Sequence, residues 1–152
     1  MALTLAGMAE VGRADGTDAH IPVAEIPAGN GVNSLGHGDV IRAIELPGAA
    51  LRSRTALRKI ALAELGRSGA VLTGRLDADG TAVFVITAAT LTPVVLRYPS
   101  LPSTETLLAD AAAAPGYYTD PLGPADWRRH VAGVLLVEVL DELRGDTDGG
   151  AS

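Results

Sequence analysis

Apolar and polar residues alternate in short runs over the first third of the chain, which is the pattern of half-buried β-strands. Residues 3–13 and 17–26 predict two strands on either side of Asp15-Gly16, a dipeptide that tolerates the positive φ of a hairpin turn. Residues 28–38 are rich in Gly and Asn and predict a loop.

The middle of the chain predicts an antiparallel meander. Residues 39–46 form a strand candidate that precedes the meander and ends at Pro47, because proline removes a donor from the ladder. Residues 83–86 are a continuous β-branched and aromatic run, which is expected in an inner strand buried on both faces. A short Gly-containing loop at residues 77–80 joins two of the strands. The remaining strands are expected at residues 55–62, 70–76, 81–90 and 94–98.

The last third of the chain predicts two helices. Ser103 or Thr104 can cap the first helix, which ends at Pro115. The second helix is expected over residues 126–144, where apolar residues recur at helical spacing and Gly145 fits a C-terminal stop.

Strands first and helices last predict an α+β fold, an antiparallel β-sheet with the C-terminal helices packed on one side. The strand stop at Pro47 and the basic stretch after it indicate a domain boundary between residues 47 and 54. We therefore expect one unit of short strands at residues 1–48, a C-terminal α+β domain at residues 49–145, and a disordered tail at residues 146–152.

Net charge and composition argue against several classes of function. The 12 basic and 18 acidic residues give a net charge of −6, which argues against a nucleic-acid-binding protein and gives no attraction to an anionic membrane. The chain has no cysteine, so disulfides, thiolate catalysis and cysteine-held iron–sulfur clusters are excluded on it. The N-terminus lacks a signal-peptide pattern, and the longest apolar run, residues 131–137, is too short to span a bilayer. A cytoplasmic protein is the expectation.

The glycines and histidines form no complete catalytic or metal-binding motif. The segment Gly29-Asn30-Gly31 has the first two glycines of a dinucleotide-binding fingerprint, but position 34 is serine and no helix is expected after it. A flexible loop is the simpler interpretation. The histidines are scattered, and no carboxylate pair lies at a metal-ligand spacing around them: His20, His37 and His130.

One basic stretch interrupts the acidic chain, with Arg52, Arg54, Arg58 and Lys59 close together. A solvated strand or linker would explain it, and so would contact with an anion or a cofactor. The pair Arg128-Arg129 in the second helix could cap carbonyls, pair with acids or face a partner, and the sequence leaves these roles open.

Three segments occur in an order that resembles a known family. The first matches the pattern L-x-x-G-[DE]-φ-φ-x-x-I-x-φ-P, in which φ is apolar, through Leu35, Gly38, Asp39, Val40, Ile41, Ile44, Leu46 and Pro47. The second is LRKIALAELGRSGAV, a lysine followed by a basic and then a small-residue segment, and the third is DWRRHVAGVLLVEVLDEL. Together they resemble the flavin-bearing subunit or domain of the molybdenum hydroxylases, the family of xanthine dehydrogenase and the carbon monoxide dehydrogenase medium subunit.

The resemblance implies a fold like the C-terminal domain of the CO dehydrogenase flavoprotein and a part in binding FAD. It implies that the apolar side chains of Val40 and Ile41 lie against the isoalloxazine ring. It also implies that Lys59 approaches the ring, where a cation would stabilise negative charge on the reduced flavin. If the match to the family shifts by one residue, Arg58 takes the place of Lys59. Leu57 stands where many relatives have an aromatic residue. No catalytic residue and no metal ligand is implied on this chain.

The resemblance covers residues 3–144, and the family's N-terminal half, whose Gly-rich loops grip the FAD pyrophosphate, has no counterpart here. It implies two partners in one complex, an iron–sulfur subunit and a large molybdopterin subunit, and it leaves a homo-oligomer open. Molybdopterin and the iron–sulfur clusters are expected on the partner chains.

Two functions of different kinds remain. The first is an electron-transfer component of an oxidoreductase complex, which passes electrons from iron–sulfur clusters through FAD to an acceptor and is not catalytic alone. The second is a non-catalytic assembly or interaction module without a bound cofactor, which the missing phosphate loops favour. A standalone enzyme has no convergent motif to support it.

Overall fold

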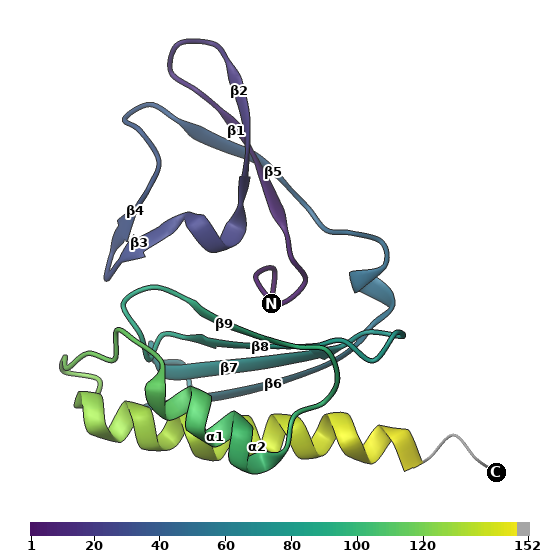
Figure 1. Cartoon of the computed structure of the whole chain (residues 1–152). Coiled ribbons are helices and arrows are strands. Elements are labelled where there is room, and N and C mark those ends of the chain that lie inside the picture. Colours follow the sequence, from purple (N-terminus) through teal and green to yellow (C-terminus); the bar gives the residue numbers. More distant parts are fainter. Residues whose placement is uncertain (149–152) are drawn as a thin grey trace.

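The computed structural model describes residues 1–148 of the chain. A four-stranded antiparallel sheet, which we call the main sheet, has two helices packed on one face, and the N-terminal strands lie over the opposite face (Figure 1). The predicted α+β architecture, with the C-terminal helices on one side of an antiparallel sheet, is confirmed.

The main sheet is a meander in the order β6-β7-β8-β9. Its inner strand β8 is buried along almost its whole length, as its run of β-branched and aromatic residues predicted. The loop at residues 77–80 closes the β7–β8 hairpin, where the Asp77 N–H donates to the Thr81 carbonyl at 2.9 Å. The strands are β6 (Arg54–Ala61), β7 (Ser68–Leu76), β8 (Ala82–Thr87) and β9 (Val94–Tyr98).

Helices α1 (Thr104–Ala113) and α2 (Ala125–Asp148) cover one face of the main sheet. The hydroxyl of Ser103 caps α1 by accepting the N–H of Thr106 at 3.1 Å, as the sequence predicted. The core between helices and sheet consists of small and branched apolar side chains with one phenylalanine, Phe84. In the described residues, no helix is long and apolar enough to cross a membrane.

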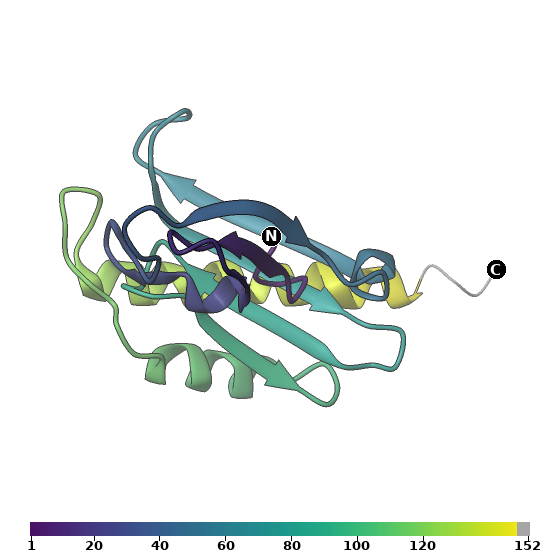
Figure 2. The same cartoon turned by 90° about the horizontal axis from the view of Figure 1, so that it is seen from above.

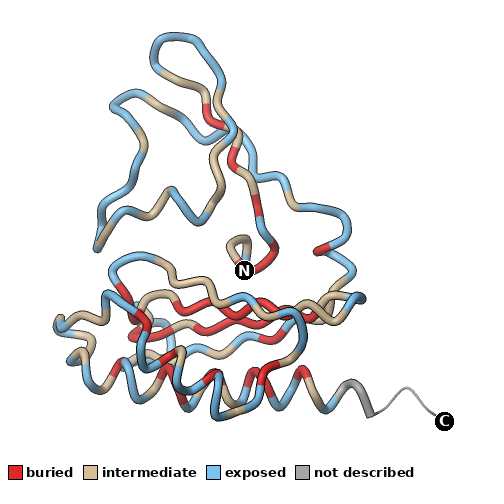
Figure 3. The backbone as a smooth tube through the Cα atoms, in the orientation of Figure 1, coloured by how far each residue is buried: buried red, intermediate tan, exposed pale blue. Residues whose placement is uncertain are grey.

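The first 45 residues form small strands that the main sheet does not continue. A three-stranded sheet has the order β2-β1-β5, so that β1 lies between two edge strands, and a separate short hairpin joins β3 to β4. Figure 3 shows that most of this unit is exposed, in contrast to the main sheet and the helix faces against it. The strands are β1 (Met8–Gly12), β2 (Asp18–Pro22), β3 (Pro27–Gly29), β4 (Val32–Asn33) and β5 (Val40–Glu45).

Three local predictions differ from the structure. Residues 3–7 form turns, closed by the Leu5 and Gly7 N–H groups that donate to carbonyls of the first two residues, so the first strand begins only at Met8. The second strand ends at Pro22, and a 3-10 turn, η1 (Val23–Glu25), follows it. The expected loop contains the β3–β4 hairpin, because Asn30 and a positive-φ Gly31 make a tight turn there.

A 3-10 turn, η2 (Ala50–Arg52), connects the small strands to the main sheet. The expected boundary between residues 47 and 54 falls in this connection, and the division into domains stays a prediction. The predicted stop of the second helix at Gly145 is wrong, because α2 continues through Gly145 to Asp148. The expected tail therefore begins within the C-terminal end of α2, and residues 149–152 lie outside the described residues.

Candidate functional site

The face of the main sheet that carries no helix is the place where Lys59 lies. Cross-strand pairing puts Lys59 opposite Val71, while Arg58 is opposite Leu72, a member of the helix-side core. Because successive side chains in a strand point to opposite faces, Lys59 and Leu57 extend from the helix-free face of β6. Both are exposed, Leu57 to 44%.

The N-terminal turn covers another part of this helix-free face. The hydroxyls of Thr4 and Thr73 are hydrogen-bonded to each other, and the Arg75 guanidinium donates to the Thr4 carbonyl at 2.8 Å. Arg75 also forms an ion pair with Asp77 at 2.9 Å. The turn is therefore fixed over β7, and the part of β6 around Lys59 stays uncovered.

Arg58 has a structural role. Its guanidinium forms ion pairs with Glu138 at 3.0 Å and with Glu142 at 2.7 Å, both on α2, and these carboxylates raise the pKa of Arg58. The basic stretch is thus split by strand alternation: Arg58 binds the helix, and Lys59 faces the other way. Arg58, the alternative to Lys59, therefore faces α2 and not the helix-free face of the sheet.

Val40 and Ile41 begin β5, one of the two edge strands of the small sheet. All six residues of β5 are exposed, and the exposed fractions of Val40 and Ile41 are 60% and 40%. Seen from above, β5 (blue) runs over the helix-free face of the main sheet (Figure 2). The two side chains are therefore available to a ligand or partner.

Asp39 fixes the start of β5. Its carboxylate accepts the N–H of Gly36 at 2.8 Å and of Ala14 at 3.2 Å, and it forms an ion pair with Arg13 at 2.7 Å. The hydrogen bond from Gly36 and then the one from Arg13 hold the pKa of Asp39 below its ordinary value. The acid of the L-x-x-G-[DE] pattern thus positions the backbone that carries Val40.

The three predicted site residues come from two separate sheets. Lys59 lines a small cavity of about 260 Å³ at the β6–β7 loop, together with Ala61, Leu62, Ala63 and Glu64. Neither Val40 nor Ile41 lines that cavity. Their convergence on one ring remains a prediction.

A second cleft, of about 320 Å³, lies where the β3–β4 hairpin approaches the main sheet. The hairpin contributes Asn30 and Gly31 to it, and Arg67 and Ser68 lie at the start of β7. Two further residues of β3, Thr87 at the end of β8, and residues of the connections after β8 and after α1, including Tyr118, complete the lining. Sequence reasoning took the Gly-Asn-Gly segment as a free loop and did not single out Arg67. The Asn-Gly turn was the one available signal of a hairpin.

Arg128 builds the wall behind this cleft. Its guanidinium is fully buried, donates to the carbonyls of Gly69 at 2.7 Å and Ala88 at 2.5 Å, and forms an ion pair with Asp120. It also lies 4.3 Å from the centre of the Tyr118 ring. Of the roles that the sequence left open for Arg128, the structure selects carbonyl capping combined with an acid partner.

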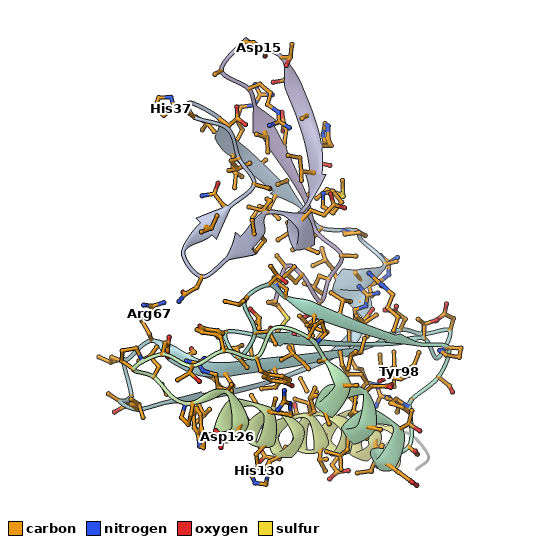
Figure 4. The ribbon with its side chains drawn as sticks, turned by 60° about the vertical axis from the view of Figure 1, so that its left-hand side comes forward. Asp15, His37, Arg67, Tyr98, Asp126 and His130 are labelled. Atoms are coloured by element: carbon orange, nitrogen blue, oxygen red, sulfur yellow. The ribbon has the colours of Figure 1, made fainter. Side chains whose placement is uncertain are left out.

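The histidines do not meet. His37 lies in a loop of the small-strand unit and His130 on the far side of α2, at opposite ends of the molecule (Figure 4). Among the side chains that the structure describes, no group of three His, Asp or Glu is placed to hold a metal ion.

Comparisons with known proteins add information on the fold. A scan against protein-family models and a search of curated proteins each found no match to the chain. Among solved structures, the chain is similar to a chain of Cu,Mo-CO dehydrogenase in its cyanide-inactivated form, with a TM-score of 0.79 and 21% sequence identity. It is also similar to chains of quinoline 2-oxidoreductase from Pseudomonas putida 86 (TM-score 0.74, 16% identity) and of reconstituted CO dehydrogenase from Oligotropha carboxidovorans (0.77, 18%).

These likenesses extend over nearly all of this chain but only part of its neighbours. The first covers 95% of this chain and 55% of the CO dehydrogenase chain, and the other two each cover 94% of this chain and 54% of theirs. The chain therefore spans about half the length of the solved chains it matches. The resemblance to molybdenum hydroxylases is confirmed at the level of the fold.

Proposed function

We propose that the chain is the C-terminal part of the FAD-binding electron-transfer subunit of a molybdopterin-dependent dehydrogenase or hydroxylase. The observation that carries the proposal is the fold likeness to CO dehydrogenase and quinoline oxidoreductase chains over 94–95% of this chain. The uncovered position of Lys59 on the helix-free face, with exposed Val40 and Ile41 on the strand above, supports it.

The residues present suit the ring of FAD better than its phosphates. Val40, Ile41 and Leu57 would exclude water from the flat ring, and the ammonium group of Lys59 would stabilise negative charge as the ring is reduced. FAD, when bound, would supply reversible electron transfer. No dinucleotide fingerprint is present, so the pyrophosphate would be held by the half of the fold that this chain does not span.

The proposed partners follow from the same likeness. An iron–sulfur subunit would deliver electrons, and a large molybdopterin subunit would carry out hydroxylation of the substrate. This chain has no cysteine to hold a cluster, so the clusters would lie on the partner.

Lys59 is the only lysine of the chain, which makes the proposal directly testable. Reductive ¹³C-methylation would label Lys59 and the N-terminal amine, giving two NMR signals to follow during titration with FAD, while visible absorption reports bound flavin. We expect the Lys59 signal to shift and saturate and the N-terminal signal to stay in place. A protein that remains colourless, with no shift at Lys59, would refute flavin binding by this chain.

A matched pair of variants gives the second arm of this test. Lys59→Ala should weaken FAD binding, and in the assembled complex it should lower the flavin reduction potential. Arg97→Ala is the control. Arg97 is an exposed cation on β9, at the opposite edge of the main sheet, and its cross-strand partner is Val83. It therefore extends from the same helix-free face as Lys59. Equal effects of the two substitutions, or an unchanged redox titration for Lys59→Ala, would remove Lys59 from the site.

The second candidate is an assembly module that binds a partner and no cofactor. It is favoured by β5, an edge strand whose residues are all exposed and include Val40, Ile41 and Ile44. Free edge strands can accept a strand from another chain. We propose the iron–sulfur subunit as the occupant, because β5 has apolar side chains on an edge that pairs with no further strand among the described residues.

Affinity purification of the tagged chain from its native cells tests this candidate. Iron and acid-labile sulfide in the co-purified fraction should fall with Ile44→Asp and remain with Leu65→Asp, which changes a leucine that is 98% exposed away from β5. Absence of iron and sulfide from the wild-type fraction, or equal loss in both variants, would contradict the module.

A further inference from the structure

The cleft between the β3–β4 hairpin and the main sheet carries an unusual charge for this protein. Although the chain has a net charge of −6, the side chains that line the cleft include one cation, Arg67, and no carboxylate. Arg67 is exposed and makes no ion pair with any described residue. Figure 4 shows it extending from the β7 side toward the hairpin.

The remaining polar groups of the cleft suit an oxyanion. Ser68 and Thr87 bring hydroxyls from β7 and β8, which can donate hydrogen bonds, and both are half-buried. The Asn30-Gly31 turn brings backbone to the opposite side, and nothing lies within 4 Å of the position of a Cβ on Gly31. A ligand can therefore approach the turn closely.

The wall of the cleft is held in place before any ligand arrives. Ala88, one of the lining residues, has a φ of 62°, which is costly for a residue other than glycine. Its carbonyl accepts from Arg128 at 2.5 Å and from the Tyr118 hydroxyl at 3.2 Å, and these bonds fix the strained backbone. Since Asp120 neutralises Arg128, the unbalanced positive charge of the cleft is that of Arg67.

We propose that this cleft binds a small phosphate-bearing ligand, with the phosphate group paired to Arg67 and hydrogen-bonded by Ser68 and Thr87. A planar guanidinium can donate two parallel hydrogen bonds to a phosphate, which explains an arginine at this position better than a general need for charge. The proposal goes beyond the flavin assignment and does not depend on it, since it uses neither Lys59 nor β5.

Amide NMR of the ¹⁵N-labelled whole chain during titration with inorganic phosphate is the direct test, at constant ionic strength to remove general screening. We expect saturable shifts at the amides of Asn30, Gly31 and Ser68, with a dissociation constant on the order of 1 mM. Shifts that do not saturate, or that spread evenly over the surface, would overturn the proposal.

Three variants separate the site from general electrostatics. Arg67→Ala should weaken phosphate binding at least about fivefold, while Arg67→Lys should lose less because the charge remains. Arg52→Ala removes an exposed arginine that lines other cavities and should leave binding unchanged. If Arg67→Ala and Arg52→Ala behave alike, the specific site does not exist.

Titration of the wild-type chain and of Arg67→Ala with adenosine 5′-diphosphate decides the source of the phosphate. Adenosine 5′-diphosphate that binds at least about tenfold more tightly than inorganic phosphate, with the same shifts and the same loss in Arg67→Ala, would identify a nucleotide ligand. Equal affinity would identify the free anion as the ligand. If Arg67→Ala binds phosphate and adenosine 5′-diphosphate as tightly as the wild-type chain does, the assignment is refuted.

Discussion

The guanidinium of Arg128 and the carboxylate of Asp120 form an ion pair in which the arginine side chain has 0% and the aspartate side chain 12% exposed surface. The same guanidinium donates to the carbonyl of Gly69 in β7 and to the carbonyl of Ala88, which directly follows β8. One side chain of α2 therefore connects the helix, the α1–α2 connection and the end of the main sheet. Its removal affects three elements at once.

We predict that Arg128→Met lowers the free energy of unfolding by about 3 kcal/mol or more, because it removes the cation that pairs with a largely buried carboxylate and one donor from each of two carbonyls. The adjacent arginine provides the matched control. The exposed Arg129 lies over the Tyr117 ring at 5.0 Å, so Arg129→Met should cost about 1 kcal/mol or less. Urea unfolding of the two variants measures the difference. Similar losses would show that the buried network contributes little beyond packing.

Gly74 is required by the approach of α2 to β7. A Cβ on Gly74 would lie 2.5 Å from Val139 Cγ1 and 2.8 Å from Leu143 Cδ1, both buried side chains of the helix. We predict that Gly74→Ala destabilises the protein by about 1–3 kcal/mol, as overpacking of a filled core does.

The control for Gly74 is Gly145, whose Cβ position has no atom within 4 Å. Gly145 lies within α2, so Gly145→Ala should leave stability unchanged or raise it by up to about 1 kcal/mol through helix propensity. Thermal unfolding followed by circular dichroism compares the pair. A loss for Gly145→Ala as large as for Gly74→Ala would contradict the packing explanation.

The fold was predictable where neighbouring residues in the sequence carry the signal. The β-branched run around Val85 gave an inner strand and the Ser103 cap gave the start of α1, because both signals are local. The turn at residues 3–7 could not be foreseen, since Thr4 contacts Thr73 across 69 positions of sequence. The β3–β4 hairpin was missed because its strands have three and two residues, too few for a pattern.

The candidate site was predictable only in part, for a similar reason. Strand alternation decides whether Arg58 or Lys59 faces α2, and the sequence does not reveal which face the helix covers. Arg67 gains its interest from a hairpin that lies 36 positions earlier in the chain, at Gly31. Contacts of this kind depend on the packing of separate elements and leave no local signature.

Asp39 should make stability depend on pH in the acid range. Because its pKa is lower in the folded state than in the unfolded chain, its contribution is fully present above the ordinary carboxyl pKa and is lost as the pH falls through the lowered value. We predict that Asp39→Asn is less stable than wild type at neutral pH, and that the two converge as the pH drops below about 4.

Urea midpoints measured at a series of pH values test this prediction. Asp141→Asn, which removes an exposed carboxylate on α2, controls for the change of net charge. A gap between wild type and Asp39→Asn that stays constant down to acid pH would mean that the carboxylate charge does not stabilise the start of β5.

The exposed apolar side chains of β5 should be detectable in the isolated chain. Val40 and Ile44 have 60% and 50% of their surface exposed on a strand whose outer edge pairs with no other described strand. Such a strand should bind the hydrophobic dye ANS and favour self-association at high concentration. We predict that Val40→Thr together with Ile44→Thr reduces ANS fluorescence and self-association by at least about twofold, and leaves the unfolding temperature nearly unchanged because little buried surface is lost. Leu65→Thr, at 98% exposure in the β6–β7 loop, is the control, since a single exposed leucine away from a strand edge should have little effect. If the β5 double variant unfolds at a markedly lower temperature, these side chains pack in the folded chain and β5 is not a free surface.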